Sequence, residues 1–354
     1  MAIQKISIEE LIAFSGKYPV LDVRSPSEFG HAHFPGATSF PIFTDEERKV
    51  IGTAYKQESR KKAIKHGLDF FGVKMRAMVE LAEKTAKEFF SRNKLPPENA
   101  LIVHCWRGGM RSAAVAWLLD LYGYDVYLLE GGYKFYRNWV LEQFEKEYRF
   151  NIVGGFTGSG KTELLKILKE KKLPVIDLEG IANHKGSAFG ALGQPPQPSQ
   201  EMFENLLAHE LYMQSLEVFW LEDESQRIGA LNIPHGFWKR MRTKQVFFLD
   251  IPFEERLDHI TKGYGSLEKE KLADAILRIQ KRLGPLETKT AIALLSENNM
   301  RECFRILLSY YDKTYIKGLN NRENLTALLN KISCSGVDAL ANTEKLLSCN
   351  TINA

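Results

Sequence analysis

The sequence lacks several features that usually indicate a protein's cellular compartment or its binding partner. Its 354 residues include only four cysteines, and they form no Cys-x-x-Cys pair, which argues against a disulfide framework. No apolar run reaches the roughly 18 residues that cross a bilayer, and residues 1–10 lack the apolar segment of a signal peptide. The formal net charge of +4 permits a polyanionic partner without requiring one. These absences predict a cytoplasmic protein that does not associate with membranes.

What the chain does contain is a repeated alternation of short apolar strands and helical segments. This alternation is typical of α/β domains with parallel sheets, and the length suits two domains. A second strand-to-helix unit begins near residue 149, so we predict domains at 1–145 and 146–354. Residues from 267 onward are mostly helical in pattern, and the segment after 334 is polar, so its pattern does not predict an ordered element. The expected strands are 20–23, 101–105, 126–129, 150–153, 174–177, 217–221 and 245–249.

The first motif follows an apolar strand and begins with Cys105. Backbone amides of a tight loop that enters a helix converge on one point and favour negative charge there, so the thiolate is stabilised. Gly108 and Gly109 give the loop its conformational freedom. Arg107 and Arg111 can bind an anionic donor group. The pattern predicts a nucleophilic Cys105, whereas the alternative is a buried structural cysteine.

The second motif, residues 155–162, matches the phosphate-loop pattern G-x-x-x-x-G-K-S/T between an apolar strand and a helix. Its amides and Lys161 can hold phosphates. Nucleotide hydrolysis is the usual association, but the pattern by itself indicates only that a phosphate is bound. A second glycine-containing loop at 183–187 either closes over that phosphate or is a surface turn. The expected phosphate-binding residues are Gly155, Thr157, Gly158, Ser159, Gly160, Lys161, Thr162, His184 and Lys185.

Acidic residues at the ends of strands are candidates for a Mg²⁺ site beside this loop. The Thr162 hydroxyl is the expected ligand within the loop, and Glu222 and Asp223 follow the strand predicted at 217–221. An ordinary solvated acidic turn is the alternative for this pair. Three further acidic residues also follow apolar segments, where parallel sheets place ligand-binding groups; they are Asp177, Glu179 and Asp250.

The first domain resembles a rhodanese domain over most of residues 5–145. The resemblance rests on segments 21–29, 31–37 and 130–133, in addition to the cysteine loop. We interpret Asp22 and Arg24 as a structural ion pair rather than as donor contacts. Common sulfurtransferases of this fold place an arginine five residues after the cysteine, but Arg111 lies six after Cys105. The longer loop puts simple sulfur transfer in doubt and leaves room for a larger group.

The whole chain resembles the bacterial tRNA 2-selenouridine synthase family, on segments 52–57, 105–112, 155–162, 184–187 and 222–225. The resemblance implies replacement of sulfur by selenium in wobble 2-thiouridine of tRNA. It implies selenophosphate as the donor, and geranyl diphosphate as the co-substrate for an S-geranylated intermediate. A protein that supplies selenophosphate is a further implied partner. Lys161 and Mg²⁺ would then hold a pyrophosphate, so nucleotide hydrolysis would not be required.

The surface that would contact tRNA is indicated only by a basic cluster and an aromatic residue. A solvated helix face is the simpler interpretation of the cluster, and base stacking would involve Trp106 or Tyr55. One alternative function is a cysteine phosphatase with a nucleotide-binding regulatory domain, which the Cys-x5-Arg spacing favours; another is a non-catalytic tRNA-binding protein. The sequence does not indicate the oligomeric state or the order of the chemical steps. The candidate tRNA residues are Lys56, Arg60, Lys61, Lys62 and Trp106, with Lys65 in the same cluster.

Overall fold

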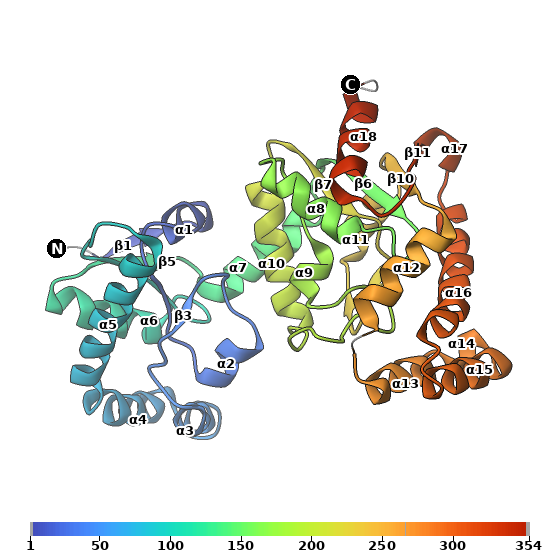
Figure 1. Cartoon of the computed structure of the whole chain (residues 1–354). Helices are drawn as coiled ribbons and strands as arrows, with labels where there is room; N and C mark the ends of the chain where they lie inside the picture. Colours follow the sequence, from blue (N-terminus) through green and yellow to red (C-terminus); the bar gives the residue numbers. More distant parts are fainter. Residues whose placement is uncertain (1–2, 266, 352–354) are drawn as a thin grey trace. The chain divides into compact units, whose positions relative to one another are not determined.

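A computed structural model describes residues 3–265 and 267–351 and divides the chain into two compact units (Figure 1). The first unit is Met1–Gln143 and the second is Phe144–Ala354. Each unit is built on its own parallel sheet, which confirms the α/β prediction. Among the described residues, no helix is both long enough and apolar enough to cross a membrane.

The first unit contains a five-stranded parallel sheet in the order β1-β5-β4-β2-β3. The central strand β4 is wholly buried because all five of its positions face packed helices or neighbouring strands. Three helices, α3 to α5, lie between β3 and β4 in the chain, and α3 and α4 carry the basic cluster that was interpreted as a helix face. The strands are β1 Gln4–Ile6, β2 Val20–Asp22, β3 Thr38–Ser39, β4 Ala100–His104 and β5 Asp125–Leu129. The helices are α1 Ile8–Ser15, α2 Pro26–His31, α3 Asp45–Gln57, α4 Arg60–Gly72, α5 Met75–Asn93, α6 Met110–Tyr122 and α7 Gly132–Gln143.

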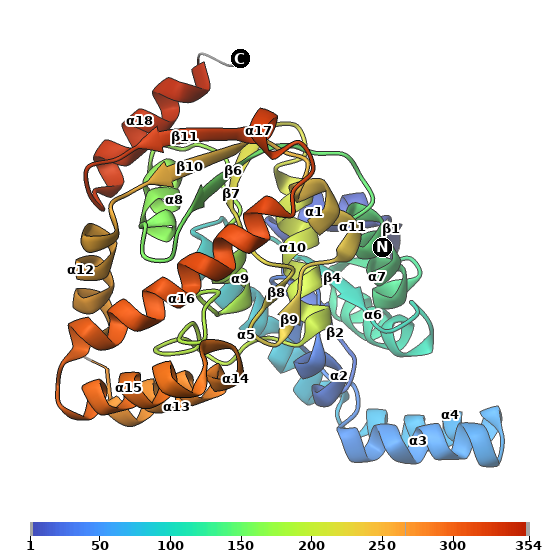
Figure 2. The same cartoon turned by 90° about the vertical axis from the view of Figure 1, so that its right-hand side faces the viewer.

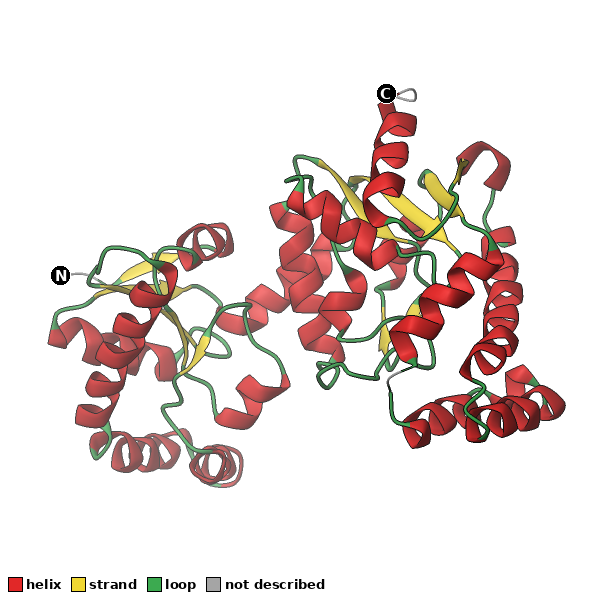
Figure 3. Cartoon of the chain, viewed as in Figure 1, coloured by secondary structure: helices red, strands yellow, loops and turns green. Residues whose placement is uncertain are grey.

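The second unit contains a four-stranded parallel sheet in the order β11-β10-β6-β7, with helices on its faces (Figure 3). A short antiparallel pair, β8 and β9, follows β7. The strands are β6 Arg149–Gly155, β7 Val218–Glu222, β8 Arg227–Ile228, β9 Leu231–Asn232, β10 Val246–Asp250 and β11 Leu329–Ser333. The first helices are α8 Lys161–Glu170, α9 Leu178–Ala182, α10 Gln200–Met213, α11 His235–Met241 and α12 Phe253–Tyr264. The later helices are α13 Lys269–Arg278, α14 Gln280–Leu283, α15 Pro285–Ser296, α16 Met300–Asn320, α17 Leu325–Leu328 and α18 Ala339–Thr351.

One expectation about the second unit was wrong. The segment 174–177 makes only one isolated bridge, from Val175 to Trp220, because Asp177 caps α9 and the chain turns into that helix at once. The C-terminal part is mostly helical, as predicted, but it also contains β11, which pairs with β10 along its whole length. Only Ile332 of β11 is fully buried, so the strand lacks the apolar run that reveals a buried strand in a sequence. The polar segment after 334 folds mostly as helix α18.

Candidate functional site

The cysteine loop joins β4 to α6 and is fixed by the turn that precedes α7. Gly108 has φ +61°, and a Cβ there would lie 3.0 Å from the Leu129 carbonyl oxygen, so the position favours glycine. At Gly132, also with positive φ, a Cβ would lie 2.4 Å from the Cys105 carbonyl oxygen. The amide of Tyr133 donates to that same oxygen at 2.8 Å. The cysteine loop and the turn at Gly132, which lie apart in the sequence, are therefore packed together and form one cradle.

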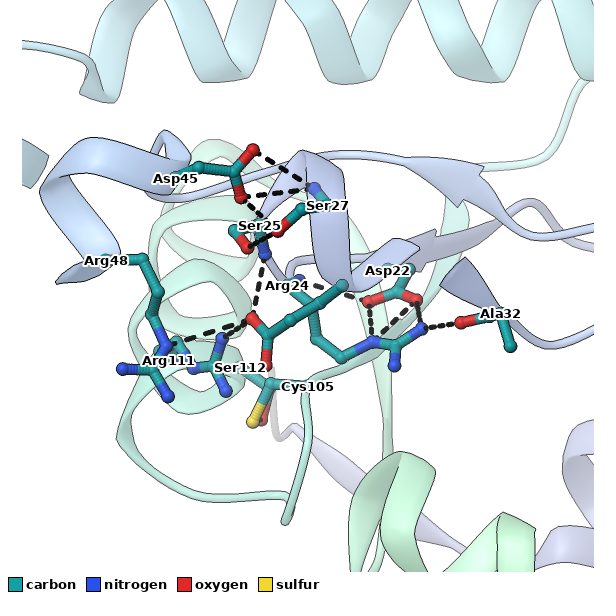
Figure 4. A network of polar contacts seen from close by, with 11 residues as sticks. Asp22, Arg24, Ser25, Ser27, Ala32, Asp45, Arg48, Cys105, Arg111 and Ser112 are labelled. Atoms are coloured by element: carbon teal, nitrogen blue, oxygen red, sulfur yellow. Dashed lines mark hydrogen bonds and ion pairs between the residues drawn. The ribbon is translucent and has the colours of Figure 1, made fainter. Parts of the chain in front are cut away.

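Cys105 lies inside this cradle and is only 3% exposed. The Ser112 hydroxyl donates to its Sγ at 3.1 Å (Figure 4). Burial raises the pKa of the Cys105 thiol, but the Ser112 hydroxyl, the backbone amides of Ser112 and Arg107, and the Arg111 charge together outweigh it. The net effect is a lowered pKa, so the loop favours the thiolate, the nucleophilic form of cysteine. Ser112 was not among the expected site residues, although it stands in the motif.

The two arginines of the loop have different surroundings. Arg111 is bound to Glu28, with 2.8 Å between Nη1 and Oε2, and Arg48 lies 3.8 Å from the same carboxylate. Burial alone would raise the pKa of Glu28, but the hydrogen bond and charge of Arg111 lower it by more. The net pKa is lowered, so Glu28 is an ionised carboxylate. Arg107 is exposed. The Arg111 guanidinium is therefore engaged by an acidic side chain, whereas that of Arg107 is open to solvent.

Asp22 and Arg24 form a buried ion pair behind the loop. Their closest approach is 2.6 Å, and neither side chain is more than 2% exposed. The guanidinium also donates to the Ala32 carbonyl at 2.7 Å and lies 3.7 Å from the centre of the Tyr133 ring. Because the pair is buried and also contacts Ala32 and Tyr133, it supports the structural interpretation.

The phosphate loop runs from the end of β6 to the start of α8, as the motif predicts. Gly155, Gly158 and Gly160 have φ values of +149°, +80° and +72°, a region that other residues rarely adopt. A Cβ on Gly155 would lie 2.5 Å from the Ser159 Oγ, so the loop folds tightly upon itself. The Lys161 Nζ donates to the Gly155 carbonyl at 3.0 Å. The expected phosphate residues from 155 to 162 thus form one compact turn at a helix N-terminus.

Glu179 and Glu222 lie beside the Thr162 hydroxyl, which donates to Glu179 Oε2 at 3.0 Å. The backbone amide of Glu179 donates to Glu222 Oε1 at 2.8 Å, and the buried Glu222 Oε2 has no hydrogen-bond partner. Burial and the neighbouring charges of Asp177 and Glu179 raise the pKa of Glu222 to about 8. Such unsatisfied, crowded oxygens fit a cation bound between them and the phosphates. Among the described residues no three His, Cys, Asp or Glu side chains form a group that could hold a metal ion by themselves.

Asp223 does not belong to this group, which corrects the expectation that it is a metal ligand. Both of its carboxylate oxygens accept hydrogen bonds from Arg322, at 2.7 and 2.9 Å, and Tyr315 donates to it at 2.7 Å. Burial alone would raise the pKa of Asp223, but the hydrogen bonds and charge of Arg322 lower it by more. The net pKa is lowered, so Asp223 is a buried, ionised carboxylate whose charge is balanced by Arg322. Adjacent acidic residues on a strand point to opposite faces, so only one of Glu222 and Asp223 can face Thr162. Glu179, noted in the sequence but not chosen, takes the second position.

The loop that carries His184 and Lys185 lies against the acidic group. A Cβ on Gly186 would lie 3.0 Å from carboxylate oxygens of both Glu179 and Glu224, so this loop and the phosphate loop share one site. His184 is buried with Nδ1 unpartnered, and burial lowers its pKa. Lys185 is exposed, with its Nζ 6.0 Å from the centre of the Tyr264 ring. Lys185 is the better placed of the two expected residues to meet an incoming phosphate.

The basic cluster lies at the end of α3 and on the first turns of α4. All of its side chains are exposed, and Lys62 forms an ion pair with Glu58 one turn earlier. Arg60 approaches Met110 at the start of α6, with 4.0 Å between Nη2 and Sδ. The cluster therefore begins beside the cysteine loop, within the same unit. Trp106 is partly exposed, 5.7 Å from Tyr133 between ring centres.

Two family models match the chain and cover most of it. Residues 148–333 match the model described as "tRNA 2-selenouridine synthase AAA domain", and residues 7–138 match "Rhodanese-like domain". A tRNA 2-selenouridine synthase of Sulfurovum sp. is 33% identical over 84% of this chain and 87% of its own length. Proteins of the same name are 32% identical in Bdellovibrio bacteriovorus, over 91% and 94%, and 36% identical in Hydrogenovibrio crunogenus, over 84% and 88%.

Proposed function

This chain belongs to the tRNA 2-selenouridine synthase family of tRNA-modifying enzymes, and from that premise we propose that it replaces sulfur by selenium in wobble 2-thiouridine. In this proposal selenophosphate is the selenium donor, and geranyl diphosphate first converts the sulfur to a thioether. The observation that carries the proposal is that one chain has both a cysteine loop that lowers the pKa of Cys105 and a phosphate loop. Neither a simple sulfurtransferase nor a simple nucleotide hydrolase requires both.

The phosphate loop serves the first step, in which the sulfur of the base attacks C1 of geranyl diphosphate. The bond from C1 to oxygen breaks, and pyrophosphate leaves with the electron pair. Amides of residues 155–162 and Lys161 stabilise the charge that develops on it. Thr162, Glu179 and Glu222 would hold Mg²⁺, which when bound neutralises further phosphate charge.

The cysteine loop serves the second step, the exchange of geranylthiol for selenium. The Cys105 thiolate attacks C2 of the base and forms a bond from C2 to Sγ; the bond from C2 to the geranylated sulfur breaks, and geranylthiol leaves with the electron pair and a proton from water. The selenium of selenophosphate then attacks C2, a bond from C2 to selenium forms, and Cys105 leaves as the thiolate. Water attacks the phosphorus, the bond from phosphorus to selenium breaks, and phosphate is released. Arg107 is exposed to bind the donor anion, while Arg111, held by Glu28, keeps the loop positively charged.

The test is an assay of purified protein with thiolated tRNA, in which each co-substrate is added alone and together and the nucleosides are identified by mass. Cys105→Ser should abolish selenation and spare geranylation, whereas Cys349→Ser, a control, should change neither. Lys161→Ala should slow geranyl transfer on the order of 10²-fold, the usual cost of losing one charge-stabilising donor, and Lys166→Ala on the same helix should not. Selenation by Cys105→Ser at the normal rate, or normal geranyl transfer by Lys161→Ala, would contradict the assignment.

For tRNA we propose that the exposed basic cluster on α3 and α4 contacts the phosphate backbone near the cysteine loop. Changing Lys61 and Lys62 to Glu should weaken tRNA binding and reduce the slope of affinity against salt, because fewer counterions are released. Lys84 and Lys87, exposed on α5, changed to Glu give a control with the same charge. Equal losses in the two double variants would show a general charge effect and no specific surface.

A further inference from the structure

A single carboxylate oxygen beside the cysteine loop, Oε2 of Glu28, is surrounded by hydrogen-bond donors and positive charge (Figure 4). Arg111 of α6 donates to it from Nη1 at 2.8 Å, and the Ser25 amide donates to it at 3.1 Å. The Nε of Arg48, on α3, lies 3.8 Å from the same oxygen. Donors from three separate segments of the chain therefore converge on one negatively charged atom.

Arg48 is held close to this oxygen, yet its Nε makes no hydrogen bond. The atom is buried and has no hydrogen-bond partner in the part of the chain that the structure describes. Helix α3 is fixed to α2, because the amide and the hydroxyl of Ser27 both donate to the Asp45 carboxylate, at 3.1 and 2.6 Å. Gly52, the first residue of segment 52–57, leaves room for the guanidinium, since a Cβ there would lie 2.9 Å from Nη1. A buried donor without a partner is costly, so Arg48 is suited to an anionic ligand that reaches it.

Arg111 acts on the reactive sulfur as well as on Glu28. Burial raises the pKa of Cys105, and the charge of Arg111 is one of the effects that outweigh burial. Glu28 is ionised, because burial raises its pKa by less than Arg111 lowers it, so it neutralises one of the two guanidinium charges. A tetrahedral oxyanion offers at least three acceptor oxygens and can bind two arginines at once. The two arginines therefore have more capacity for an anion than one carboxylate oxygen uses.

We propose that Glu28 occupies the place of the donor's phosphate group, and that Arg48 is a third arginine of the donor site, in addition to Arg107 and Arg111. An arriving tetrahedral oxyanion displaces the carboxylate and binds to Arg48 and Arg111 beside Cys105. The inference rests on the proposed function, in which the cysteine loop receives selenophosphate. It adds which residues bind the phosphate group and which side chain competes with it.

Protection of Cys105 from iodoacetamide tests this with the full-length protein, inorganic phosphate and thiophosphate, and the modified cysteine is identified by mass. Glu28→Gln should raise the affinity for both anions by about three- to tenfold, because one competing charge is removed. Glutamine can still accept from the Ser25 amide, so the start of α2 is preserved. Arg48→Ala should lower the affinity by about three- to tenfold, because one charge-assisted contact is lost.

The matched controls are Glu80→Gln and Arg76→Ala, which alter an exposed ion pair on α5 and should leave protection unchanged. Thermal unfolding checks that each variant is folded. Unchanged protection in a folded Glu28→Gln or Arg48→Ala variant overturns the inference, while donor binding at the cysteine loop stands. If neither anion protects Cys105 in any variant, the inference and the donor assignment of the proposed function are both overturned.

The phosphate backbone of tRNA is the other source of the same chemical group, so tRNA affinity is measured with the same variants. The inference expects Glu28→Gln and Arg48→Ala to change phosphate protection much more than they change tRNA binding. A change in tRNA affinity with unchanged phosphate protection would assign Arg48 to the RNA backbone and overturn the donor site.

Discussion

The lowered pKa of Cys105 depends on the hydroxyl of Ser112, which lies seven residues further along the chain in the first turn of α6. Burial alone would raise the thiol pKa and make this cysteine inert. Ser112 reverses that effect because its hydroxyl and its amide both point at the sulfur. Arg111, which the spacing suggested as an anion-binding residue, is paired with Glu28, and its charge also helps to lower the pKa of Cys105.

Replacing Ser112 by Ala should raise the pKa of Cys105. The native pKa is lowered, so thiolate is present above it; without the donor, the titration moves to higher pH and less thiolate remains at neutral pH. Thiolate absorbance near 240 nm, measured as the difference from Cys105→Ser across pH, gives the midpoint. Ser91→Ala, exposed on α5, is the control and should leave it unchanged. The selenation rate should follow the thiolate fraction; an unshifted midpoint in Ser112→Ala would remove Ser112 from the mechanism.

Helix α16 holds both loops of the second unit's site, although it lies far from them in the sequence. Figure 2 shows it as a long helix running from the sheet toward α15. Tyr311 accepts from the Ala188 amide, and Asp312 is 2.7 Å from Arg256, which donates to Thr157. One turn later, Tyr315 accepts from the Gly155 amide at 3.2 Å and donates to Asp223. The helical pattern was visible in the sequence, but these partners were not.

Tyr315→Phe should weaken diphosphate binding by about two- to tenfold, the effect expected for one lost hydrogen bond. The hydroxyl positions the phosphate loop without touching the ligand, so the Kd should rise while the rate of geranyl transfer at saturation changes little. Tyr310→Phe on the same helix is the matched control. Direct titration with geranyl diphosphate and saturation kinetics separate the two effects. A lower saturated rate with unchanged Kd would mean that Tyr315 acts on the chemistry instead.

At the scale of the whole molecule, the chain consists of two units that each have a sheet and a core of their own. The core of the first includes Leu101 and Val103 of β4, and that of the second includes Leu249 of β10 and Ile332 of β11. The phosphate loop, the acidic group and α16 all lie in the second unit. The thiolate loop and the basic cluster lie in the first.

Residues 1–143 and 144–354, produced separately, should therefore each unfold cooperatively, as measured by circular dichroism on heating. The second fragment should bind geranyl diphosphate with nearly the affinity of the full chain, because the proposed contacts are within it. Neither fragment should selenate tRNA by itself. A second fragment that is folded but does not bind the diphosphate would show that the first unit contributes to the site.

Local pattern by itself determined the two parallel α/β units, the cysteine loop and the phosphate loop, because strand alternation, glycine positions and helix starts are encoded within a few neighbouring residues. Tertiary structure decided the rest. Glu179 lies by Thr162, whereas the Asp223 carboxylate is bound by Arg322. Glu28 pairs with Arg111 across 83 residues, and Tyr315 reaches Gly155 across 160. The mostly polar strand β11 is a strand only because β10 lies beside it. Such pairings depend on how the chain folds back on itself, which no local pattern records.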